Sequence, residues 1–217
     1  MNEMSKKACI FDLDGTLFDT LSDLVIATNY VLEKQGMPQL SRERIASIVG
    51  GGGAQLLTKA VPCGTSVQTI DAMYKDWEVY LAAHGVEHTS WYDGVEETLE
   101  QLKCRGVKLA VLSNKPDSAT QQAVNTLKPQ FFDRVHGSSA AFPRKPDPTG
   151  LFKTMEELGV SADECLFIGD SANDIHVAQN AGVFCLGVLW GYGEAEGLFS
   201  TNPDALIERP AQILDYL

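Results

Sequence analysis

Short apolar runs with the character of buried strands recur along the chain. They cover residues Ala8–Phe11, 107–112, 164–168 and 183–188, with a weaker run at 131–135. Segments with helical periodicity separate these runs, at 94–105, 116–127, 148–158 and 173–181. Strands that alternate with helices of this length are typical of βαβ units. The pattern therefore predicts an α/β fold with a parallel sheet and helices on both of its faces.

One long block interrupts this alternation. Residues 19–88 contain no convincing strand, and amphipathic helical spacing occurs within them at 21–35, 42–48 and 67–83. A run of four glycines at 50–53 predicts a flexible turn between helices. We therefore expect a helical cap at 19–88, inserted over the carboxyl ends of the strands of an α/β catalytic core at 1–18 and 89–217.

Composition and charge narrow the possible partners and location. The formal net charge of −12 disfavours nucleic acid and anionic membrane surfaces. The five cysteines are an odd number without a Cys-x-x-Cys spacing, so no disulfide framework is predicted. The first seven residues lack an apolar signal region, and no apolar stretch approaches the roughly 18 residues of a membrane span. These features predict a cytoplasmic protein, and they do not predict its oligomeric state.

Two carboxylates follow the first apolar strand. Asp12 and Asp14 are two residues apart, so on an extended segment they point to the same side. The carboxyl end of a strand is where open α/β sheets bind ligands. A turn at Asp14-Gly15 is an ordinary structural explanation for Asp14, but it does not explain Asp12.

A second acidic group follows the strand at 164–168. Asp170 and Asp174 flank the start of a helix, where Ser171 could serve as N-cap and Asp174 could favour the helix dipole. Asp170 has no such structural explanation. If the two strands are neighbours, the four carboxylates gather in one place, and a compact group of oxygen ligands suits Mg²⁺.

Two further segments supply groups that can bind an anion. Ser113 and Asn114 follow the strand at 107–112 and precede a helix that opens with a proline, although an ordinary capped helix start explains them equally well. Lys145 lies in Arg144-Lys145-Pro146-Asp147-Pro148, where the prolines restrict the backbone. A lysine held in this way beside an acidic cluster could clamp a phosphate.

In chain order, the segments around Asp12, Ser113, Lys145 and Asp170 resemble the four motifs of the haloacid dehalogenase-like superfamily. The inserted block resembles its small helical cap, and the chain is most similar to the phosphoglycolate phosphatase-like subgroup. The resemblance implies a Rossmann-like parallel sheet core and a Mg²⁺-dependent phosphatase. Such an enzyme hydrolyses a small phosphomonoester, similar to 2-phosphoglycolate, through an aspartyl-phosphate.

The resemblance also implies a role for each motif residue. Asp12 corresponds to the nucleophile and a metal ligand, and Asp14 to the general acid/base, with its backbone carbonyl on the metal. Asp170 corresponds to the third protein ligand of the metal, and Asp174 to a ligand that acts through water or another residue. Ser113, Asn114 and Lys145 correspond to the residues that bind the phosphate group.

Other activities remain open. A sugar-phosphate mutase of the same superfamily would keep both Asp12 and Asp14, and a nucleotidase or pyrophosphatase is a further alternative. A phosphonate hydrolase would need a reactive cap lysine, and none of Lys34, Lys59 and Lys75 stands out. A dehalogenase would leave Asp14 without a task, because its leaving group needs no proton. A phosphoacceptor signalling domain is disfavoured by the insertion after the first strand.

Overall fold

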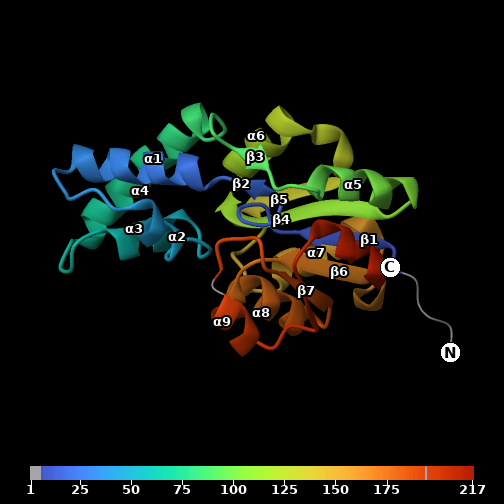
Figure 1. The fold of residues 1–217 in the computed structure, drawn as a ribbon. Coiled ribbons are helices and arrows are strands. Elements are labelled where there is room, and N and C mark those ends of the chain that lie inside the picture. The colour runs from blue at the N-terminus through green and yellow to red at the C-terminus, as the bar shows by residue number, and fades with distance from the viewer. Residues whose placement is uncertain (1–5, 194) are drawn as a thin grey trace.

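The computed structural model describes residues 6–193 and 195–217, and its core is a six-stranded parallel sheet (Figure 1). The strand order is β5-β4-β1-β6-β7-β8, and every neighbouring pair is parallel. The strands are β1 (Ala8–Phe11), β4 (Lys108–Pro116), β5 (Arg134–Ser138), β6 (Cys165–Gly169), β7 (Phe184–Val188) and β8 (Ala205–Ile207). The predicted α/β fold class is confirmed. Because β1 lies between β4 and β6, the ends of these three strands are adjacent.

Helices cover both faces of this sheet. One face packs against α5 (Val95–Cys104) and α6 (Asp117–Leu127), and the other against α7 (Thr149–Leu158), α8 (Ala172–Ala181) and α9 (Ala195–Ser200). Successive residues of β1 alternate between the two cores: Cys9 packs in the first and Ile10 in the second. Three short 3₁₀ helices complete the core, at Pro129–Phe131, Ala162–Glu164 and Pro210–Tyr216.

A separate group of helices lies at the carboxyl ends of the strands (Figure 1). It consists of α1 (Leu21–Lys34), α2 (Arg42–Ala46), α3 (Gly53–Ala60) and α4 (Val67–His84), packed around their own apolar cluster. The chain enters and leaves this group through a two-stranded antiparallel ribbon of β2 (Phe18–Asp19) and β3 (Ser90–Trp91). Within the described part of the chain, none of the helices is both long and apolar enough to cross a membrane.

The glycine run at 50–53 contains more structure than the predicted turn. Helix α3 begins at Gly53, and its eight residues are too few to give a clear helical periodicity in the sequence. A Cβ on Gly53 would lie 2.3 Å from Cζ3 of Trp77, so only glycine lets α3 approach the indole ring of α4. Gly52, with φ of 80°, is in a conformation that favours glycine. The run therefore sets the packing of the helical group.

Candidate active site

The ends of β1 and β6 bring three buried carboxylates together. Asp12 follows β1, and its backbone N–H donates to the carbonyl of Ile168 in β6 at 2.9 Å. Oxygens of Asp12, Asp170 and Asp174 lie within 4.8 Å of one another. The neighbouring strands expected from the sequence pattern are therefore present, and they place these three acids side by side.

Asp170 is held tightly by its surroundings. One carboxylate oxygen accepts from Thr16 Oγ1 at 3.2 Å, and the other accepts from the backbone N–H groups of Tyr192 at 2.8 Å and Gly193 at 3.3 Å. Burial, followed by the nearby charges of Asp174 and Asp12, raises the pKa of Asp170 to about 8. A cation at this position would relieve that repulsion and favour the ionised form.

Lys145 connects two of the acids. Its ammonium lies 2.8 Å from Asp12 Oδ1 and 2.6 Å from Asp174 Oδ1. Burial alone would lower the pKa of Lys145, but the two carboxylates outweigh it and raise the pKa above its usual range. Burial also raises the pKa of Asp12 to about 7, although the charge of Lys145 opposes this change. The lysine therefore favours the ionised form of Asp12.

The oxygens of Asp174 are already used. Besides the contact with Lys145, Asp174 Oδ2 accepts from the backbone N–H of Ser171 at 2.9 Å and from its hydroxyl at 2.7 Å. This pairing caps the start of α8. The oxygens of Asp170 accept hydrogen bonds in the same way, so hydrogen bonding does not rank these two acids as metal ligands. The hard, anionic oxygens of Asp12, Asp170 and Asp174 together fit a divalent cation such as Mg²⁺.

Asp14 points to a different partner. Its Oδ1 lies 2.9 Å from the ammonium of Lys115 and accepts from Thr20 Oγ1 at 2.7 Å, while its Oδ2 lies 3.3 Å from the same ammonium. The motifs alone do not single out Lys115, which is 5% exposed. The strand predicted from the sequence ends at residue 112, whereas β4 continues to Pro116, so the two-residue spacing of Ser113 and Lys115 acquires a meaning only once this longer strand is seen.

The side chain of Asn114 links three segments. Its Oδ1 accepts from the backbone N–H of Lys145 at 2.7 Å, and its Nδ2 donates to the carbonyl of Lys145 at 3.2 Å. The same Nδ2 donates at 3.1 Å to the carbonyl of Gly50, which also accepts from Asn173 Nδ2 at 3.2 Å. The side chain of Asn114 is thus occupied in positioning Lys145 and the glycine loop.

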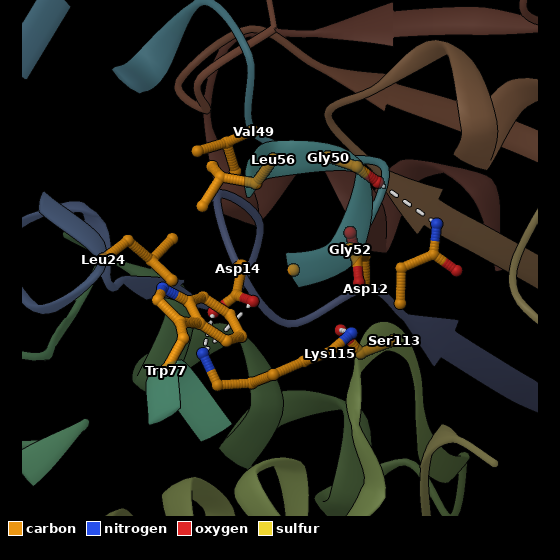
Figure 2. A pocket seen from close by; sticks show the side chains of 12 residues that line it. Asp12, Asp14, Leu24, Val49, Gly50, Gly52, Leu56, Trp77, Ser113 and Lys115 are labelled. Atoms are coloured by element: carbon orange, nitrogen blue, oxygen red, sulfur yellow. Dashed lines mark hydrogen bonds and ion pairs between the residues drawn. The ribbon is translucent and has the colours of Figure 1, made fainter. Parts of the chain in front are cut away.

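A pocket opens between the core and the helical group (Figure 2). Its core side is polar and includes Asp12, Asp14, Ser113 and Lys115. Its other side carries no charged side chain among the described residues and is formed by Leu24, Val49, Gly50, Gly52, Gly53, Leu56 and Trp77. The candidate catalytic groups are therefore concentrated on the core side of the pocket.

Comparison with known proteins agrees with this geometry. The family model described as haloacid dehalogenase-like hydrolase matches residues 9–188, a span that contains all four motifs. The chain belongs to the haloacid dehalogenase-like hydrolase family. The superfamily resemblance drawn from the motifs is confirmed, as is the assignment to a phosphatase among its hydrolases.

Relatives in this family cover nearly the whole chain. A phosphoglycolate phosphatase of Vibrio parahaemolyticus is 33% identical over 99% of this chain and 97% of its own. One of Pseudomonas syringae is 33% identical over 93% of this chain and 76% of its own. A crystal structure described as a predicted phosphoglycolate phosphatase from Haemophilus somnus matches with a TM-score of 0.90 and 29% identity, over 99% of this chain and 98% of that one.

Proposed function

We propose that this family member is a Mg²⁺-dependent phosphatase that hydrolyses a small phosphomonoester through an aspartyl-phosphate. The observation that supports this best is the environment of Asp12. Its carboxylate lies beside the ammonium of Lys145 and the carboxylate of Asp170, and it lines the pocket together with Asp14. A carboxylate that can act as nucleophile and a second carboxylate are thus available within one pocket.

In the first half of the proposed reaction, an oxygen of Asp12 attacks phosphorus and the bond from phosphorus to the ester oxygen breaks. Asp14 gives its proton to the departing alcohol oxygen. In the second half, water attacks the phosphorus of the aspartyl-phosphate, Asp14 takes up a proton from this water, and phosphate leaves while Asp12 is regenerated. The hydroxyl of Ser113, the backbone of Asn114 and the ammonium of Lys145 stabilise the phosphoryl oxygens.

Asp12, the backbone carbonyl of Asp14 and Asp170 would hold Mg²⁺, with Asp174 supporting them through Lys145. When bound, the ion would neutralise charge on the phosphoryl group and on the carboxylates around it. This assignment rests on the grouping of the acidic oxygens and on the raised pKa of Asp170, which a nearby cation would lower.

For the substrate, we infer a small ester, and 2-phosphoglycolate first among candidates. The pocket lies between the core and the cap, and its lining includes both Asp12 and Asp14, the proposed nucleophile and acid/base. Relatives named phosphoglycolate phosphatase cover 99% and 93% of this chain. Residues 19–88 would act as a cap that opens for entry and closes on the substrate, around the ribbon of β2 and β3.

Phosphate release from a panel of phosphate esters tests the proposal. Asp12→Asn should abolish turnover, and Asp14→Asn should slow it about 10²- to 10⁴-fold, the usual contribution of general acid–base catalysis. Asp163→Asn, at an exposed site in a 3₁₀ helix, removes the same charge far from the pocket and serves as the control. Turnover by Asp12→Asn close to that of the control would refute the nucleophile assignment. Formation of an isomeric sugar phosphate in place of free phosphate would instead identify a mutase.

A further inference from the structure

Lys115 has a position that the proposed mechanism does not use. It is the only cationic residue among the described residues that line the pocket, and its side chain is 3% exposed. Figure 2 shows Asp12 and the ammonium of Lys115 on opposite sides of Asp14. One lysine of the site, Lys145, therefore serves the proposed nucleophile, and the other lies where the alcohol part of the substrate would be.

The ammonium of Lys115 retains capacity for another acceptor. An ammonium group has three N–H donors, and within the described part of the chain its hydrogen-bond acceptors are the two oxygens of Asp14. Asp14, as the proposed acid, must lie within hydrogen-bond distance of the ester oxygen. An anionic group one carbon away from that oxygen would consequently come close to Lys115.

The opposite wall of the pocket makes this charge decisive for selectivity. This wall is formed by the apolar side chains of Leu24, Leu56 and Trp77. A carboxylate that faces them gives up hydrogen bonds to water, and this costs free energy unless a cation such as Lys115 replaces those bonds. We propose that Lys115 binds a carboxylate on the alcohol part of the substrate and so selects anionic phosphate esters over neutral ones. This inference rests on the proposed phosphatase function and assigns a specificity-determining residue to it.

A matched pair of substrates tests whether Lys115 binds a substrate carboxylate or acts in some other way. 2-Phosphoglycolate and its neutral amide, 2-phosphoglycolamide, differ only in the charge of the group that Lys115 would bind. The wild-type enzyme should prefer the acid by about 10- to 100-fold in kcat/KM, the size of a charge-assisted hydrogen bond. Lys115→Met should remove this preference mainly through a higher KM for the acid, and Lys115→Arg should retain part of it.

Lys103→Met, at a partly exposed position on α5, removes one positive charge away from the pocket and controls for long-range electrostatics. It should keep the wild-type preference. Circular dichroism on each variant establishes that it is folded, and the wild-type comparison of the two substrates needs no variant at all. Equal kcat/KM of the wild type for acid and amide would overturn the proposal.

An equal loss on both substrates in Lys115→Met would also overturn it, because it would make Lys115 a positioning residue for Asp14. Failure of the phosphatase function and failure of the Lys115 assignment give different results. If the wild-type enzyme releases no phosphate from any ester in the panel, the phosphatase mechanism fails. If it releases phosphate from neutral esters without preferring acids, only the assignment of Lys115 fails.

Discussion

The side chain of Asn114 offers a direct test of how the site is held together. Asn114→Ala removes its hydrogen bonds to both backbone groups of Lys145 and to the carbonyl of Gly50. Asn173→Ala is a matched control, because Asn173 donates to the same carbonyl of Gly50 and, in the described structure, makes no side-chain hydrogen bond to Lys145. The difference between the two variants isolates the contacts with Lys145.

The magnitude follows from the number of bonds lost. Each hydrogen bond between neutral groups contributes about 1 kcal/mol to stability. Asn114→Ala loses three of them and buries unsatisfied backbone groups, so its free energy of unfolding should fall by about 3 kcal/mol. Asn173→Ala loses one bond at a partly exposed position and should fall by about 1 kcal/mol or less. Because the backbone of Lys145 loses its anchor, kcat should also be at least about tenfold lower in Asn114→Ala than in Asn173→Ala.

Urea denaturation followed by circular dichroism measures the stability difference, and phosphate release at saturating ester measures kcat. If the amide of Asn114 positions Lys145, the two variants differ in both measurements. Equal losses of stability and equal kcat values would refute the idea that the amide of Asn114 positions Lys145. Equal stability with a lower kcat for Asn114→Ala would show that the amide acts on the substrate directly.

Three further predictions concern the surroundings of the acidic cluster. Gly191→Ala should lower the free energy of unfolding by about 1 to 3 kcal/mol, because the new Cβ would lie 2.3 Å from Cβ of Asp170. Gly197→Ala is the control, because a Cβ there meets open space and should cause no such loss. Thermal unfolding measures the stability of both variants. Tyr192→Phe should cost about 1 kcal/mol in stability and raise KM, since its hydroxyl accepts from the backbone N–H of Thr20 at 2.5 Å, just before the first helix of the helical group. A chelator should abolish phosphate release and added Mg²⁺ should restore it, so activity undiminished by chelator would contradict the metal assignment.

Hydrophobic periodicity was sufficient to predict the parallel sheet, because the central strands are continuous apolar runs. The apolar segment at 164–168 corresponds closely to β6, and Ala8–Phe11 to β1. The two-residue strands β2 and β3 are too short to produce a pattern, and β8 is only three residues long. Their positions depend on tertiary pairing, which local sequence does not encode.

The candidate site was predictable wherever a polar residue directly follows an apolar strand. Asp12 and Asp170 are such residues, and the adjacency of β1 and β6 brings them together. Lys115 and the side-chain contacts of Asn114 required the structure, because a lysine within a strand is usually solvated and an asparagine can serve as an ordinary cap. Long-range contacts decide these two roles.

The charges of the site argue for a divalent cation independently of the family. The site contains four carboxylates, those of Asp12, Asp14, Asp170 and Asp174. Two ammonium groups accompany them: Lys145 pairs with Asp12 and Lys115 with Asp14. If all are ionised, the sum is −4 + 2 = −2, in a chain whose net charge is already −12. Such a site would repel a phosphate ester, whereas one divalent cation makes it neutral. We therefore expect binding of the proposed substrate to depend on a divalent metal, with Lys145 at its phosphate end and Lys115 at its other end.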